Sequence, residues 1–151
     1  MRCFVAIELP EHIKARLFHE VEILKQQGLV SGKFVEKDNL HLTLKFLGEL
    51  TEEEISKIKE KLSEIDFNNF EISLSDFGVF PNENFIKILW VGLETEEFEL
   101  KTLKNILDNK LVEEGISKEK KEFTSHVTLV RIKKVKDKRL FLKKLENLRV
   151  P

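Results

Sequence analysis

Two copies of a short pattern, a histidine followed two residues later by a threonine, are the part of this sequence best suited to chemistry. His41 and Thr43 lie in NLHLTLKFLGEL, and His126 and Thr128 lie in FTSHVTLVR. Random placement of the histidines and threonines along the chain would give about 0.16 such pairs. Two copies, each followed by leucine, therefore favour a function for the pair.

Both pairs lie in segments that alternate polar and apolar residues, as half-buried strands do. In a strand, residues two apart share a face, so each histidine points to the same side as its threonine. Displacement at phosphorus needs a base and an acid, and imidazole serves as either near neutral pH. If the two faces meet, His41 and His126 form one acid-base site, with hydroxyl donors from Thr43 and Thr128.

The alternative is that each histidine is a structural residue with satisfied hydrogen bonds, and for either pair alone we would prefer it. The second copy, in the same context, reverses that preference. The residues alone do not say which histidine is the acid and which is the base.

The segments around the two pairs repeat the order strand, helix and His-x-Thr strand. The first copy is a strand over 2–9, a helix from Pro10 to near Gly28, and a strand from Leu40 to Gly48. A capping box of Thr51 and Glu54 begins the next helix. The rest is predicted to contain strands over 70–80 and 85–94 joined by a Pro81-Asn82 turn, a helix over 98–114, a strand over 123–132 and a helix over 137–148.

Length, composition and charge indicate how many domains the protein has and in which compartment it lies. With 151 residues, 41% of them hydrophobic, we expect a single domain spanning residues 1–151. The formal net charge of −1 gives no global attraction to nucleic acid, so an anion site must be local. The lone Cys3 and the short apolar run after Arg2 predict a soluble cytoplasmic protein without contact with a membrane. We also expect a monomer.

Four segments, FVAIELP, NLHLTLKFLGEL, KILWVGL and FTSHVTLVR, resemble the two-histidine (2H) phosphoesterase superfamily. They are most similar to its RNA 2′,3′-cyclic phosphodiesterase branch, also called 2′-5′ RNA ligases. The resemblance, with the repeat, predicts an α+β fold of two similar lobes. Each lobe is expected to be an antiparallel sheet with helices on its outer face, and the two to enclose a central cleft.

The resemblance implies hydrolysis of RNA 2′,3′-cyclic phosphate ends to 2′-phosphates, with tRNA fragments among the candidate substrates. It implies that His41 is the proton donor to the leaving 3′ oxygen and His126 the proton acceptor that activates water. It also implies ATP-independent 2′-5′ ligation in reverse, and no metal or other cofactor. Two rival hypotheses are a non-catalytic RNA-binding module of the same fold and a 2H enzyme acting on another cyclic or 2′-5′ phosphoester.

Further residues are candidates for substrate binding. Arg131 matches an arginine that the family uses for phosphate or RNA, yet it lies five residues after His126, so strict alternation points it away unless a bulge intervenes. Lys45 is in phase with His41 and is either at the edge of the cleft or a surface lysine. The basic run from Lys133 to Arg139 either follows an RNA backbone or is simply solvated.

Two aromatic residues and the chain's length complete the expectations. Phe80 and Trp90 are candidates for stacking on a base, although core packing is the preferred interpretation for Trp90. Members of the resembled family continue for some thirty residues further, so the domain is expected to lack C-terminal strands of that family. His12 and His19 lack metal-ligand spacing and are expected at the surface.

Overall fold

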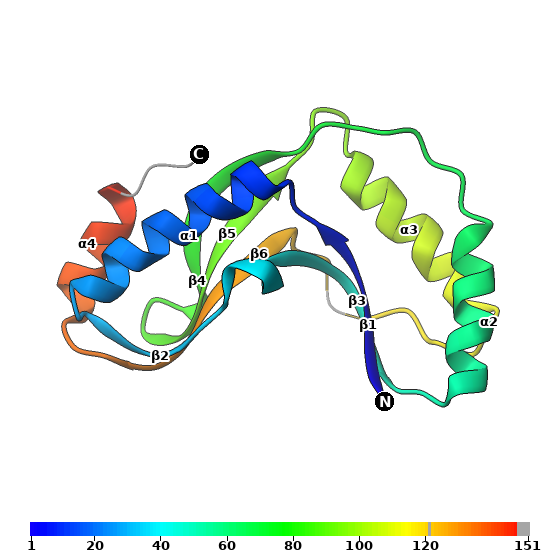
Figure 1. The fold of residues 1–151 in the computed structure, drawn as a ribbon, viewed down its shortest axis with the longest axis horizontal. Helices are drawn as coiled ribbons and strands as arrows, with labels where there is room; N and C mark the ends of the chain where they lie inside the picture. Colours follow the sequence, from blue (N-terminus) through cyan, green and yellow to red (C-terminus); the bar gives the residue numbers. More distant parts are fainter. Residues whose placement is uncertain (121, 148–151) are drawn as a thin grey trace. The chain divides into compact units, whose positions relative to one another are not determined.

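The computed structural model describes residues 1–120 and 122–147 (Figure 1). Over these residues the strands form two antiparallel sheets, one from β1 and β3 and one in the order β2-β6-β5-β4. The α+β prediction is therefore confirmed. The elements are β1 (Arg2–Glu8), α1 (Glu11–Gln26), β2 (Val30–Phe34), the 3-10 helix η1 (Lys37–Asn39), β3 (His41–Glu49), α2 (Glu52–Ser63), β4 (Ser73–Asn82), β5 (Phe85–Glu94), α3 (Glu99–Val112), β6 (His126–Val135) and α4 (Lys138–Asn147).

The chain divides into two compact units, and neither is one half of the sequence. The first unit comprises 1–6, 43–73 and 94–125, and the second comprises the segments 7–42 and 74–93 and the chain from His126 onward. Strands β1 and β3 pass from one unit to the other, after Ala6 and after Leu42. The repeat in the sequence therefore does not correspond to two separately folded halves.

The second unit contains the four-stranded sheet, with α1 and α4 on one of its faces. Leu17, Val21 and Leu24 form the buried stripe of α1 at helical spacing. Lys25 of α1 lies over the ring of Phe34, 5.3 Å from its centroid, which places α1 on the face that carries Phe34. Other buried residues of this core include Leu89 and Val91 of β5, Val127, Leu129 and Val130 of β6, and Phe141 of α4.

The position of α4 follows from its contacts with β4. Leu142 and Leu145 of α4 share a cavity with Phe77 and Val79. Phe77 and Val79 alternate along β4 with Gly78. Their side chains therefore point to one face of the sheet, and Gly78 is on the other. The helix α4 therefore packs on the core face of the sheet.

The first unit pairs its two helices with each other, and α2 and α3 lie side by side in Figure 1. The predicted capping box is confirmed, because the Thr51 hydroxyl accepts from the Glu54 amide at 3.2 Å and the Glu54 carboxylate accepts from the Thr51 amide at 2.9 Å. Ile58 of α2 and Leu107 of α3 are buried. Among the described residues, no helix is long and apolar enough to cross a membrane.

Several predicted boundaries need correction. Strand β4 begins at Ser73 instead of residue 70. The turn expected at Pro81-Asn82 begins later, because β4 continues to Asn82 and the Asn82 carboxamide oxygen accepts from the amides of Asn84 and Phe85 at 2.9 and 3.0 Å. Strand β6 begins at His126 instead of residue 123 and runs to Val135 instead of ending at residue 132. The last residue of the predicted C-terminal helix, residue 148, lies outside the described residues.

Candidate active site

Each His-x-Thr pair begins a strand, with His41 the first residue of β3 and His126 the first residue of β6. The intervening Leu42 and Val127 are fully buried, whereas the histidines and threonines are half-buried. The predicted alternation is therefore correct at both copies. His41, His126 and Thr128 belong to the second unit, and Thr43 is the first residue of a segment of the other unit.

A backbone carbonyl fixes the tautomer of His41. Its Nδ1 lies 2.6 Å from the carbonyl oxygen of Asn39, the last residue of η1. A carbonyl only accepts, so Nδ1 must carry the proton and donate it. Nε2 is therefore the ring nitrogen that could exchange a proton with a substrate.

The short η1 helix that holds Asn39 is linked to α1 by an ion pair between Lys37 and Glu11, 2.6 Å apart. The hydrogen bond from Lys37 holds the pKa of the Glu11 carboxyl below its usual value, and the same bond raises the pKa of Lys37. Both side chains are solvated, so the pair contributes little to global stability. Its effect is local, because it holds the segment that leads into His41.

Two aromatic rings pack against His126. The Phe80 ring meets the imidazole edge-on, with centroids 5.1 Å apart and an interplanar angle of 89°. Trp90 lies 6.2 Å from the imidazole and stacks on Phe80 at 4.9 Å. Such contacts restrict the orientation of the imidazole ring. Trp90 is half-buried and its ring packs on Phe80 beside His126, and stacking of either ring on a base stays a prediction.

Two glycines near these rings, which the sequence analysis did not select, have no room for a side chain. A Cβ on Gly78 would lie 2.3 Å from Cζ2 of Trp90, and a Cβ on Gly92 would lie 2.3 Å from Oγ of Ser75. Gly92 is also the residue directly opposite His126 in the β5–β6 pairing. An isolated glycine inside a strand often marks such a close approach, so this signal was present in the sequence.

Arg131 reaches the face of His126 through a β-bulge. In the β5–β6 register Trp90 is opposite Thr128 and Leu89 is opposite Val130, so Leu129 is skipped. Ile88 is then opposite Arg131. Directly opposed residues of antiparallel strands share a face, and Ile88, Trp90 and Gly92 share one by alternation.

Arg131 therefore lies on the same face of the sheet as His126 and Thr128. The bulge that the odd spacing required is present. Leu129 and Val130, the two consecutive residues at the bulge, are both fully buried, as expected when the alternation slips by one. We call this face, opposite α1 and α4, the His126 face.

Lys45 is neither at a cleft edge nor at the surface, so both interpretations of this residue were wrong. Its side chain is 2% exposed, and Nζ donates to Asp108 of α3 and to the carbonyl of Ser117, each at 3.0 Å. Asp108 also pairs with the buried Lys104 at 3.2 Å. Lys45 points to the same side of β3 as His41. Near Lys45, however, residues of α3 and of the loop after α3 cover that side of the strand.

Comparison with known proteins identifies the family of this chain. The model of the family "LigT like Phosphoesterase" matches residues 7–90. An RNA 2′,3′-cyclic phosphodiesterase of Archaeoglobus fulgidus is 42% identical, with 89% of this chain and 74% of that protein covered. One of Methanocaldococcus jannaschii is 38% identical, with 97% and 80% covered.

Solved structures share the fold. The crystal structure of Escherichia coli LigT complexed with 3′-AMP has a TM-score of 0.71 and 30% identity, covering 86% of this chain and 72% of that chain. A crystal structure of a Thermus thermophilus protein has a TM-score of 0.69 and 28% identity, covering 100% and 79%. By sequence and by structure, this chain belongs to the LigT-like phosphoesterase family.

Proposed function

We propose that this protein is a hydrolase that opens the 2′,3′-cyclic phosphate at RNA ends to a 2′-phosphate by two-histidine acid-base catalysis. The observation that carries the proposal is the pair of His-x-Thr strand starts, in a chain whose relatives are named RNA 2′,3′-cyclic phosphodiesterases. The hydrogen bond from Nδ1 of His41 supports it, because it holds the ring in one orientation and makes Nε2 the nitrogen that donates when the ring is doubly protonated.

In the proposed reaction a water oxygen bonds to phosphorus as the bond from phosphorus to the 3′ oxygen breaks. His126 accepts the proton of the attacking water, and Nε2 of His41 gives a proton to the departing 3′ oxygen. Hydroxyls of Thr43 and Thr128 donate to the non-bridging oxygens, where charge develops. The guanidinium of Arg131 neutralises charge on the phosphate.

The same groups also serve ligation, in which a different nucleophile replaces water. A 5′-hydroxyl in place of water would attack the cyclic phosphate and form a 2′-5′ linkage, with the proton transfers at the two histidines unchanged in kind. The new bond to phosphorus forms as the bond from phosphorus to the 3′ oxygen of the cyclic phosphate breaks. The cyclic phosphate is thus itself the activated group, and ATP is not needed. Fragments of tRNA are candidate substrates for hydrolysis and for ligation.

The first test is hydrolysis of a short oligonucleotide ending in a 2′,3′-cyclic phosphate, in the presence of EDTA, with the position of the product phosphate identified. We expect metal-independent formation of a 2′-phosphate. A 3′-phosphate product would contradict the assigned leaving group. Binding of RNA with no turnover would instead favour the non-catalytic module, and faster turnover of another cyclic or 2′-5′ phosphoester would favour the other rival.

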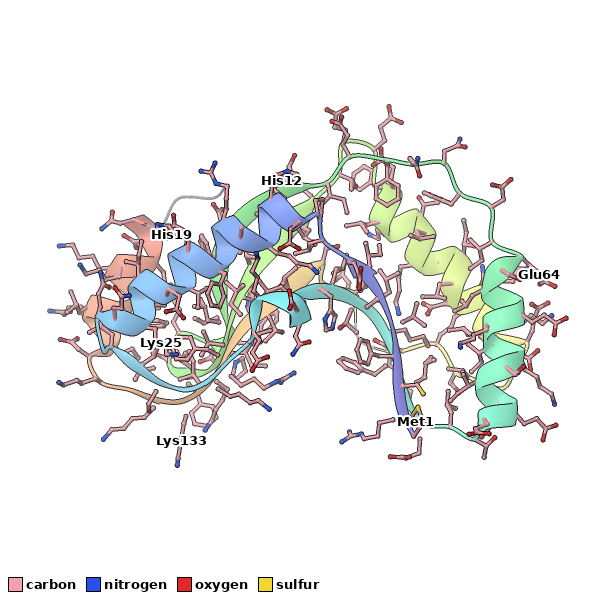
Figure 2. The ribbon with its side chains drawn as sticks, viewed as in Figure 1. Met1, His12, His19, Lys25, Glu64 and Lys133 are labelled. Carbon is pink, nitrogen blue, oxygen red and sulfur yellow. The ribbon has the colours of Figure 1, made fainter. Side chains whose placement is uncertain are left out.

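Substitution separates the two catalytic histidines from the others. We expect His41→Ala and His126→Ala each to lower turnover by at least about 100-fold, because each removes one proton-transfer group. His12→Ala and His19→Ala are matched controls on the exposed side of α1 (Figure 2) and should retain activity. Near-normal turnover by either catalytic variant, with its fold intact, would refute the paired mechanism.

A further inference from the structure

We propose that the His126 face binds the RNA strand that leads to the cyclic phosphate, through a row of four basic residues. This basic row consists of Lys33 of β2 and Arg131, Lys133 and Lys134 of β6. The inference rests on the proposed function and specifies which surface of the sheet holds the nucleotides next to the cyclic phosphate.

The strand register places the row on one face. Lys33 is directly opposite Arg131, which shares the His126 face. A second bulge skips Lys133, so that Ile132 is opposite Gly32 and Lys134 is opposite Ser31. Ile132 is buried, whereas Lys133 and Lys134 are both exposed.

The neighbouring pair confirms the side on which Lys134 lies. Val30, which precedes Ser31 in β2, is buried on the core face. Adjacent residues of a strand point to opposite faces, so Ser31 and its partner Lys134 are on the His126 face. Figure 2 shows the side chain of Lys133 pointing away from α1. The second bulge therefore keeps the basic side chains on the His126 face.

Gly32 allows the two strands to meet at this bulge. A Cβ at Gly32 would lie 2.2 Å from the carbonyl oxygen of Arg131. Its φ of 153° is also one that L side chains rarely adopt. Glycine at this position therefore keeps Lys33 in register with Arg131.

The row is electrostatically available to an anion. All four side chains are exposed, and none of the ion pairs among the described residues involves them. None of the residues on this face that are paired between β2 and β6 or between β5 and β6 carries a carboxylate. These residues are Ser31, Lys33, Ile88, Trp90, Gly92, His126, Thr128, Arg131 and Lys134. A local charge of about +4 therefore stands in a protein whose formal net charge is −1.

The row continues from the proposed catalytic residues along the same strand. Four pairing steps separate Thr128 from Lys134, which at a rise of about 3.3 Å each is about 13 Å. A phosphate held at His126 and Thr128 is too far away to contact Lys134 as well. The outer lysines must therefore contact phosphates of other nucleotides, and such contacts position a strand without reading its sequence.

The structure divides the basic run from Lys133 to Arg139 and so provides a matched control. Lys133 and Lys134 are on β6, whereas Lys138 and Arg139 are exposed residues of α4, which packs on the core face. Lys143, also exposed on α4, makes a control set of three. Substituting either set of three with glutamine changes the net charge equally.

The experiment compares the row variant Lys33→Gln/Lys133→Gln/Lys134→Gln with the control Lys138→Gln/Arg139→Gln/Lys143→Gln. Arg131 stays unchanged because it is assigned to the cyclic phosphate. The substrates are a nucleoside 2′,3′-cyclic phosphate and an oligonucleotide ending in the same group. We expect the row variant to retain turnover of the mononucleotide and to lose kcat/KM for the oligonucleotide.

The salt dependence of RNA binding gives the expected size of the effect. Each phosphate contact with a single strand contributes about −0.7 to the slope of log affinity against log salt concentration. Loss of three contacts should lower the slope by about 2, so the wild type should lose about 20-fold more affinity than the row variant between 50 and 200 mM salt. The control should keep the wild-type slope. Equal slopes for row variant and wild type, or an equal loss in the control, would overturn the proposal.

Binding measured by fluorescence anisotropy separates this proposal from the proposed function. The probe is an oligonucleotide with a 2′-phosphate end, which needs no turnover. If neither substrate is hydrolysed by the wild type, the proposed function fails, yet a lower salt slope in the row variant alone would still support the row. If hydrolysis is normal and the slopes agree, only the row fails.

Discussion

Gly78→Ala should disturb the candidate active site through Trp90 without touching a proposed catalytic residue. An added Cβ would lie 2.3, 2.6 and 2.8 Å from three atoms of the indole ring, whereas ordinary contact begins near 3.4 Å. The indole must therefore move by about 1.1 Å, the difference between 3.4 and 2.3 Å. It is stacked on Phe80 and both rings contact His126, so the imidazole should shift with them.

The displacement has two expected effects. Overpacking of this kind typically costs about 1 to 3 kcal/mol of unfolding free energy. A misplacement of about 1 Å at a catalytic group can cost on the order of 100-fold in rate. We therefore expect Gly78→Ala to lower kcat for a nucleoside 2′,3′-cyclic phosphate by tenfold to 100-fold, as an order of magnitude, with the fold retained at room temperature.

The double variant Gly78→Ala/Trp90→Leu tests the cause. Trp90→Leu removes the ring atoms that the new methyl group would meet, so the loss of stability caused by Gly78→Ala should be at least about 1 kcal/mol smaller in that background. Urea denaturation of the four proteins gives this coupling, and steady-state kinetics gives kcat. Wild-type kcat and stability in Gly78→Ala, or strictly additive losses in the cycle, would refute the reasoning.

The first unit provides two further predictions. Asp108→Ala should destabilise by about 3 to 5 kcal/mol because it leaves two buried lysines without their shared carboxylate, whereas Lys45→Met should cost less because the pair of Asp108 with Lys104 survives. The reverse order of urea midpoints would contradict this account. Thr51→Ala should cost about 1 kcal/mol by removing the cap of α2. The hydrogen bond from the Thr51 amide holds the pKa of Glu54 below its usual value, so its stabilisation is complete above the unfolded-state pKa. The stability difference between wild type and Glu54→Ala should therefore shrink as pH falls through the lowered folded-state pKa, and a constant difference would exclude this coupling.

Local signals predicted most of the elements. Pro10 and the apolar spacing of Leu17, Val21 and Leu24 indicated α1, and Thr51 with Glu54 indicated the start of α2. These features act within a few residues, so the sequence contains them completely. The same holds for the alternation at His41 and His126, which placed both residues on strands.

Features that depend on distant partners could not be obtained in this way. Lys45 is in phase with His41, but its burial depends on Asp108 and Ser117, which lie 63 and 72 residues further along the chain. The grouping of Phe80 and Trp90 around His126 likewise depends on how β4, β5 and β6 meet. The alternation of polar and apolar residues along one strand does not indicate which distant residues will lie beside it.

Arg131 is an intermediate case, because the bulge needed to bring it to the His126 face was considered but not predicted. The consecutive buried residues Leu129 and Val130 were the local sign of it. A bulge is stabilised by the strands on both sides, here β2 and β5, so its presence is a property of the sheet.

The bulge at Leu129 also affects how β6 tolerates changes in length. A chain with one residue fewer between Thr128 and Arg131 would place the arginine four positions after His126, and an unbulged strand would then carry it on the same face. Loss of a residue and loss of the bulge cancel each other in their effect on side-chain direction. The arginine side chain would move along the sheet by less than one residue step, while the buried residues kept their face. Relatives that differ by one residue at this place can therefore retain the same arrangement of histidine, threonine and arginine, and an alignment gap there is no sign of a lost site.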